Sequence, residues 1–166
     1  RRAGHRRNAP IQRELPERFS QLGWIRLCLG DCDDAIAQFT KALLLEPQRT
    51  QTRLHLVDAL QRMGRSDEAQ QVLTEGLALT PDASDLLQAR IQLLIDTKRA
   101  EEARSLCHHL LRLHPHDGNN WFLLARVLAQ RRRLRSAERV LARAQRLAAP
   151  QQLDLWQKIG WLALEM

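Results

Sequence analysis

The sequence repeats itself with a period of 34 residues, and this repeat constrains the fold more than any other feature. An alanine occupies one position of every unit: Ala35, Ala69, Ala103 and Ala137. A bulkier side chain or a cysteine follows four residues later: Phe39, Leu73, Cys107 and Leu141. A proline closes each unit: Pro47, Pro81, Pro115 and, one residue late, Pro150. A chain with this period is expected to stack similar units rather than to form one irregular core.

Each unit is predicted to contain two helices, called A and B below. Apolar residues recur at helical spacing, as in Leu56, Leu60 and Met63. The closing proline cannot continue a helix, so it separates one unit from the next. Glycine and proline are scarce (7 and 6 residues) and aromatic residues make up 4%, which favours helices over sandwiches or barrels. Small side chains such as Gly23 and Ala35 stand where helices A and B must approach closely.

These features resemble the tetratricopeptide repeat family. The first unit carries most of the family's consensus: Phe19, Leu22, Gly23, Gly30, Ala35, Phe39, Ala42 and Pro47. The resemblance covers residues 16–166 and implies an all-α fold, a right-handed α-solenoid of stacked antiparallel helix pairs. The expected repeats lie near 16–49, 50–83, 84–117 and 118–152, with a partial repeat or capping helix at 153–166. Residues 1–15 are expected to form a basic tail or linker.

The C-terminal segment matches the start of a fifth repeat. Allowing for the one-residue slip at Pro150, residues 156, 159, 160 and 161 align with 19, 22, 23 and 24. Trp161 and Leu164 are apolar where a solenoid end is normally polar. This segment is therefore either a cap with its apolar face inward or a repeat continued in a longer protein, and we expect continuation. Self-association of the chain through this helix is a further alternative.

The resemblance also implies a function, because related domains bind partner proteins on the concave face lined by helices A. Transferred position by position, the partner-binding residues are Glu17, Trp24, Leu54, Asp58, Arg62, Asp85, Gln88, Gln92, Asp96, Asn119, Phe122, Arg126 and Trp161. The acids in this set suggest a partner with positive or hydrogen-bond-donating groups. Trp24, Phe122 and Trp161 are candidate apolar anchors, although the tryptophans could instead pack within the solenoid. The carboxylate clamp of chaperone-binding relatives is not expected, because Ser20 and Trp24 replace its lysine and asparagine.

The net charge of +7 is unevenly distributed. Residues 1–13 hold five arginines and no acid, and residues 126–146 hold eight arginines and one glutamate. The second group contains a predicted basic patch: Arg131, Arg132, Arg133, Arg135, Arg139, Arg143 and Arg146. Residues 139, 143 and 146 share one helix face. The alternative function is therefore binding of nucleic acid or an anionic surface through this patch and the tail. Charged outer faces are also often simply solvated.

An enzyme is not expected. No phosphate-binding loop, nucleophilic triad or convergent carboxylate pair is recognisable. Cys107, His108, His109, His114 and His116 cluster in sequence, but adjacent helical residues diverge while zinc needs converging ligands. We therefore expect no metal and no cofactor. Three cysteines favour a reducing compartment such as the cytoplasm, with the periplasm open for a fragment of an exported protein. No segment reaches the ~20 apolar residues of a membrane span.

Overall fold

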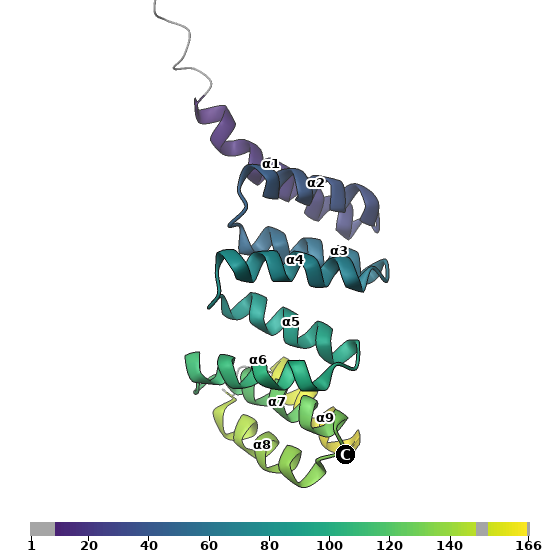
Figure 1. The fold of residues 1–166 in the computed structure, drawn as a ribbon. Helices are drawn as coiled ribbons and strands as arrows, with labels where there is room; N and C mark the ends of the chain where they lie inside the picture. Colours follow the sequence, from purple (N-terminus) through teal and green to yellow (C-terminus); the bar gives the residue numbers. More distant parts are fainter. Residues whose placement is uncertain (1–8, 149–152, 166) are drawn as a thin grey trace, which may run out of the picture. The chain divides into compact units, whose positions relative to one another are not determined.

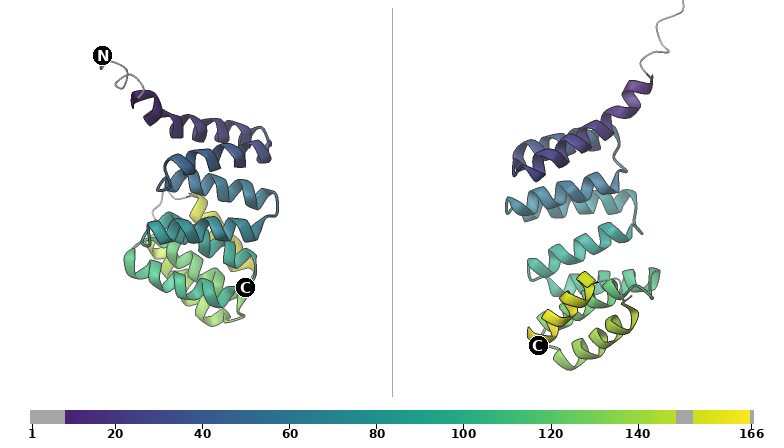
Figure 2. Two further views of the ribbon diagram at one scale, coloured as in Figure 1. Left: turned by 45° about the horizontal axis from the view of Figure 1, so that its top comes forward. Right: turned by 180° about the vertical axis from the view of Figure 1, so that it is seen from behind.

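The computed structural model describes residues 9–148 and 153–165, which form helices joined by short turns (Figures 1 and 2). The helices are α1 (Ala9–Cys28), α2 (Cys32–Leu45), α3 (Thr50–Arg62), α4 (Ser66–Leu79), α5 (Ser84–Asp96), α6 (Ala100–Leu113), α7 (Gly118–Gln130), α8 (Leu134–Leu147) and α9 (Leu153–Glu165). The predicted all-α solenoid of helix pairs is confirmed. None of these helices is both long enough and apolar enough to cross a membrane.

The chain divides into two compact units, Arg1–Leu86 and Leu87–Met166, with the division inside α5. Unit 1 contains the pairs α1–α2 and α3–α4 (Figure 1). Unit 2 contains most of α5 together with α6, the pair α7–α8, and α9. Residues 9–15 of the predicted tail belong to α1, whereas residues 1–8 and Pro150 lie outside the described residues.

The core of each helix pair lies where the small repeated residues stand. The alanine shared by all repeats is fully buried each time: Ala35, Ala69, Ala103 and Ala137. The residue four positions later is buried as well, and Phe39, Leu73 and Cys107 have no exposed surface. At Gly23, an added Cβ would lie 2.6 Å from Cε1 of Phe39. Glycine at this position therefore lets helices A and B approach to ring contact in the first repeat.

The turn between helices A and B uses one backbone conformation in all four repeats. The residues at this turn have positive φ: Gly30 (84°), Gly64 (72°), Lys98 (60°) and Arg132 (55°). They are spaced by 34 residues, so the repeat extends to backbone geometry. Only glycine adopts this left-handed conformation without steric cost. Lys98 and Arg132 therefore hold a strained backbone that the first two repeats avoid.

A long side chain ties helix A to the preceding proline turn in two repeats. The buried Arg53 donates from one NH2 group to the carbonyl of Pro47 (2.7 Å) and from the other to that of Val72 (3.0 Å). An added Cβ at Gly76 would lie 2.3 Å from Cδ of Arg53, so glycine makes room for this side chain. Two repeats later, Nε1 of Trp121 donates to the carbonyl of Pro115 (2.8 Å). The bonds to Pro47 and Pro115 thus give a partner to a backbone carbonyl in the turn, two residues after the preceding helix ends.

Candidate functional site

A pocket of about 660 Å³ opens between the A helices α1 and α3 in unit 1. We call it the α1–α3 pocket. Its walls combine apolar and hydrogen-bonding side chains: Glu17, Ser20, Gln21, Trp24, Ile25, Arg49, Thr50, Gln51, Thr52 and His55. Trp24 and Ile25 keep 46% and 54% of their surface exposed. Both are therefore accessible to a ligand from solvent.

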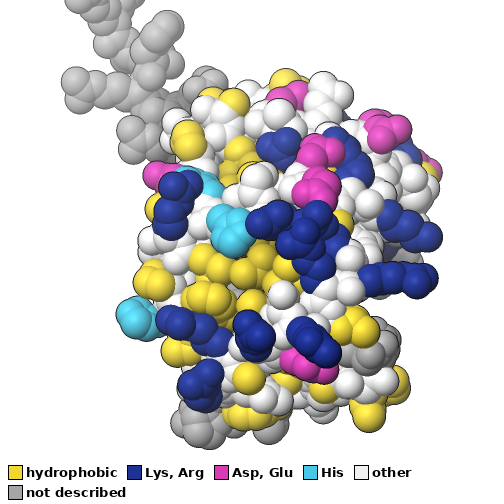
Figure 3. Space-filling view, turned by 60° about the horizontal axis from the view of Figure 1, so that its bottom comes forward, with side chains coloured by type: hydrophobic (Ala, Val, Ile, Leu, Met, Phe, Trp, Pro, Cys, Tyr) yellow, Lys and Arg dark blue, Asp and Glu magenta, His cyan; other side chains and the backbone are white. Residues whose placement is uncertain are grey.

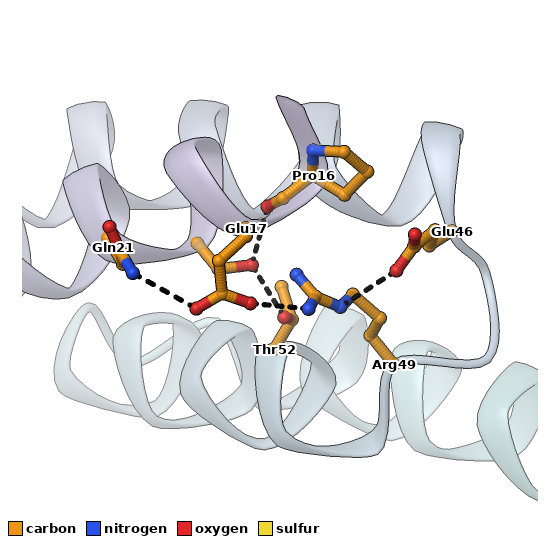
Figure 4. Close-up of polar contacts among 7 residues, drawn as sticks. Pro16, Glu17, Gln21, Glu46, Arg49 and Thr52 are labelled. Atoms are coloured by element: carbon orange, nitrogen blue, oxygen red, sulfur yellow. Dashed lines mark hydrogen bonds and ion pairs between the residues drawn. The ribbon is translucent and has the colours of Figure 1, made fainter. Parts of the chain in front are cut away.

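The polar rim of the pocket is centred on an ion pair between Glu17 and Arg49 (Figure 4). Nε of Arg49 also contacts a carboxylate oxygen of Glu46 at 2.9 Å, and Gln21 donates to the other oxygen of Glu17 at 3.2 Å. The hydrogen bond and positive charge from Arg49 lower the pKa of Glu17 below its ordinary value. The predicted acid at position 17 is thus bound by a cation within the protein.

Hydroxyl groups join α1 to α3 at the floor of the pocket. Ser20 Oγ donates to the carbonyl of Pro16 (3.0 Å) and lies 2.7 Å from Oγ1 of Thr52 (Figure 4). The same arrangement recurs two repeats later in unit 2, where Gln88 donates to the amide oxygen of Asn120 at 2.8 Å. Thr52 and Asn120 are both almost completely buried. These bonds hold neighbouring A helices at a defined separation.

A cluster of rings tilted to one another lies on the apolar side of the pocket. The rings of Trp24 and His55 lie 4.6 Å apart between centroids, and Phe39 lies 5.6 Å from His55 on the core side. Burial lowers the pKa of His55 below its ordinary value, and the nearby Asp58 partly opposes this shift. Burial therefore favours the neutral form of His55, which suits a ring packed between two aromatic groups.

A second polar surface joins α5 to α7 within unit 2. Arg126 donates to the side-chain oxygen of Gln92 and lies 3.8 Å from a carboxylate oxygen of Asp96. Gln92 in turn donates to Asp96 at 2.8 Å. Gln130 donates to the backbone carbonyl of Ile95 at 2.8 Å. Three predicted partner-binding residues thus meet here in one hydrogen-bonded network.

The other predicted partner-binding residues are placed less uniformly. Asp58 and Arg62 pair with each other on α3 at 2.9 Å. Asp85 is exposed on α5, whereas Leu54 and Asn119 are half-buried. Phe122, predicted as an apolar anchor, is 5% exposed and belongs to the core of α7, α8 and α9. Trp161, another predicted anchor, is 71% exposed on α9.

The predicted basic patch lies at the start of α8 and along it. Six of its seven arginines are exposed, while Arg131 is half-buried and pairs with Glu101. Arg143 lies over the ring of Trp121, 4.3 Å from its centroid. No sequence pattern indicated this aromatic contact, because residues 121 and 143 lie on different helices.

The cysteine and histidine cluster of the sequence does not converge on a metal site. Cys107 is completely buried, and burial raises the pKa of its thiol to about 12. His108 is exposed, while His109 is half-buried. Among the described residues, no group of three or more histidine, cysteine or acidic side chains could hold a metal ion.

Sequence reasoning missed Arg49 and His55, two residues that define the α1–α3 pocket. A signal for Arg49 was available, since residues 32 positions apart meet across neighbouring A helices. This offset relates Glu17 to Arg49, Ser20 to Thr52, and Gln88 to Asn120. The repeat period of 34 conceals it, because partners are shifted along the helix by two residues. No pattern pointed to His55.

Comparison with solved structures shows the same fold in several proteins. The chain is similar to MamA from Desulfovibrio magneticus RS-1, at 16% identity over 92% of this chain and 85% of that chain (TM-score 0.73). It is also similar to a thermophilic TPR protein of Thermus thermophilus, at 20% identity over 91% and 82% (TM-score 0.74). A tetratricopeptide repeat protein from Parabacteroides merdae matches at 16% identity over 92% and 61% (TM-score 0.70).

No curated protein sequence matches this chain significantly. The family model described as tetratricopeptide repeat matches residues 29–93 and again residues 94–159. These two segments cover most of the chain and include helices from α2 to α9. The chain therefore belongs to the tetratricopeptide repeat family.

Proposed function

We propose that this chain is a non-enzymatic protein-interaction scaffold that binds a peptide segment of its partner in the α1–α3 pocket. The family supports the general role, since tetratricopeptide repeats generally serve as scaffolds. The pocket supports the specific one, because its volume of about 660 Å³ is suited to a side chain with its flanking backbone. The single observation that carries the proposal is the exposed Trp24 at the edge of this pocket.

The charge of the pocket argues for an apolar rather than a basic anchor on the partner. Glu17, the predicted acid that lines this pocket, is paired with Arg49, and Asp58, farther along α3, is paired with Arg62. A cationic side chain would have to displace one of these arginines. An apolar side chain could instead cover Trp24 and Ile25 and gain about 25 cal/mol for each Å² removed from water.

Hydrogen-bonding groups around the apolar surface would orient the peptide backbone. The side chains of Gln21, Thr50 and Gln51 line the pocket together with Ser20. Amide and hydroxyl groups can both donate and accept, so they suit the alternating carbonyl and N–H groups of an extended peptide. The proposed ligand is therefore an uncharged extended segment carrying one large apolar residue.

Selection from a phage-displayed library of random peptides tests this proposal. We expect selected peptides to share a large apolar residue and to lose at least about 30-fold in affinity with Trp24→Ala, as for a hot-spot tryptophan worth ~2 kcal/mol. Trp161→Ala is the matched control, because it removes an even more exposed tryptophan from another helix. Calorimetric titration with one selected peptide, made synthetically, measures its affinity for the unmodified chain and for each of the two variants. Failure to select any binder, or equal losses with the two variants, contradicts the proposal.

A further inference from the structure

Four arginines form a continuous row on α8, and we call them the arginine row: Arg135, Arg139, Arg143 and Arg146. At 3.6 residues per turn, all four project within about 80° of one another. With a rise of 1.5 Å per residue, the row is about 16 Å long. Each of the four is exposed, and so are Arg132 and Arg133 in the turn before the helix.

No acidic side chain in the described part of the chain neutralises the charges of this row. No ion pair among the described side chains involves any of its four arginines, whereas the arginines before α4 and α6 are paired. Arg65 binds Glu68 through two nitrogens, at 2.6 and 2.7 Å, and Arg99 lies 2.7 Å from Glu102. On α8 the only acid is Glu138. On the face shown in Figure 3, dark blue basic side chains similarly predominate over magenta acidic ones in the lower half.

Helix stability does not explain why the row begins with Arg135. The first turns of α2, α4 and α6 carry acids at the position of Arg135, namely Asp33, Asp67 and Glu101. Acids there interact favourably with the helix dipole, and an arginine interacts unfavourably. The fourth repeat thus breaks a local rule that the other three keep. Such departures are expected where a residue serves another purpose.

One arginine of the row, Arg143, is held in place by an aromatic ring of α7. The guanidinium of Arg143 lies 4.3 Å from the centroid of Trp121. That ring is fixed in turn, because its Nε1 donates to the carbonyl of Pro115. An arginine already ordered by an aromatic ring loses less side-chain entropy when it binds a ligand.

We propose that the arginine row binds the phosphate backbone of double-stranded nucleic acid without reading its sequence. Guanidinium groups suit phosphate because they form paired hydrogen bonds with its oxygens. Neutralising phosphates releases condensed counterions, so a row of exposed arginines can supply affinity without apolar contacts.

The surroundings of the row distinguish this ligand from other anions. A membrane surface is disfavoured, because α8 turns most of its apolar surface inward. Ala137, Leu141 and Ala144 are buried, and Leu134, at 40% exposure, is the only large apolar side chain of α8 that is open to solvent. An acidic protein is disfavoured because α8 offers only Leu134 and Ala142 as exposed apolar contacts beside the row, and exposed ion pairs alone contribute little. Single strands usually need an aromatic platform, but Arg143 covers Trp121.

Fluorescence anisotropy with a short DNA duplex of mixed sequence tests the proposal. Four phosphate contacts predict a slope of log K against log salt of about −3.6, or roughly 150-fold weaker binding between 50 and 200 mM salt. The variant Arg139→Gln, Arg143→Gln, Arg146→Gln should reduce that slope by about 2.7. Glutamine keeps the helix propensity of arginine, and far-ultraviolet circular dichroism verifies the fold.

A matched variant separates the row from general attraction to a positive protein. Arg18→Gln, Lys41→Gln, Arg112→Gln removes the same number of positive charges from exposed sites on other helices. It should change the slope of log K against log salt by less than about 0.9, the value of one phosphate contact. Equal weakening by both variants would overturn the proposal. So would the absence of duplex binding at low salt, or tighter binding of single strands, poly-glutamate or phosphatidylserine vesicles.

Discussion

Replacing Gly23 with alanine tests whether the contact between α1 and α2 sets the packing of unit 1. The added Cβ would lie 2.6 Å from Cε1 and 2.7 Å from Cδ1 of Phe39. Real side chains do not approach so closely, and the ring of Phe39 has no exposed surface into which it could move. Either the ring leaves its preferred rotamer or the two helices separate.

The expected loss is a difference between two opposing effects. Overpacking of a well-packed core costs about 1–3 kcal/mol. Replacing a helical glycine with alanine returns about 0.5–1 kcal/mol of backbone entropy. Taking the middle of each range, we expect Gly23→Ala to destabilise unit 1 by about 1 kcal/mol, and by at most about 2.5 kcal/mol. Gly160 on α9 aligns with Gly23, but an added Cβ there meets nothing within 4 Å. Gly160→Ala should therefore stabilise the chain by about 0.5–1 kcal/mol, because it saves backbone entropy and meets no steric obstacle.

The fourth repeat suggests a compensating change. At the positions of Gly23 and Phe39 it has Ala125 and Leu141, and both are buried in a well-formed core. Phe39→Leu should therefore relieve the contact made by Gly23→Ala. We expect the double variant to be at least about 1 kcal/mol more stable than the sum of the two single changes predicts.

Urea denaturation followed by circular dichroism measures these differences, and hydrogen exchange of α1 and α2 peptides assigns them to unit 1. Local readouts matter because repeat proteins need not unfold in one step. A neutral or stabilising Gly23→Ala would refute the steric argument. Strict additivity in the double variant would show that the ring of Phe39 is not the obstacle.

Three further predictions concern single residues. Lys98→Gly should stabilise the chain by about 0.5–1 kcal/mol, because relief of left-handed strain (~1–2 kcal/mol) exceeds the entropy cost of glycine (~0.5–1 kcal/mol). A lower melting temperature in thermal unfolding would contradict this prediction. Since burial lowers the pKa of His55, the unfolded chain binds its proton more tightly, and stability should fall as the pH drops below about 6.5. His55→Gln should remove that part of the pH dependence of the melting temperature, and an unchanged profile would contradict the assignment. The buried Cys107 should resist alkylation until the chain unfolds, whereas the exposed Cys28 should react at once; mass spectrometry of alkylated peptides distinguishes the two.

The repeat register predicted the fold closely because it records packing directly. Ala35 and its equivalents are small in the sequence and fully buried in the structure. The same register located the turns, since the left-handed residues at 30, 64, 98 and 132 share its spacing. A helix pair leaves few alternatives once its small residues and turns are known.

The candidate site was less predictable because it depends on contacts between repeats. The partner-binding positions implied by the family identified Glu17 and Trp24 but not what binds them, namely Arg49 and His55. Phe122 was expected on the partner-binding face, on the assumption that every A helix has the same rotation about its own axis. Its ring instead packs in the core of unit 2. Such rotations depend on neighbouring side chains, which a single-repeat pattern does not contain.

The bonds from Arg53 and Trp121 to the proline turns bear on how repeat sequences diverge. An arginine and a tryptophan share neither charge nor shape, yet each donates a hydrogen bond to the proline carbonyl six residues before it. Selection at this position can therefore act on the donor and its reach rather than on the amino acid. A substitution matrix would score the exchange as a mismatch. Two repeats of such a chain can thus differ in this residue altogether while the proline turn before each stays anchored.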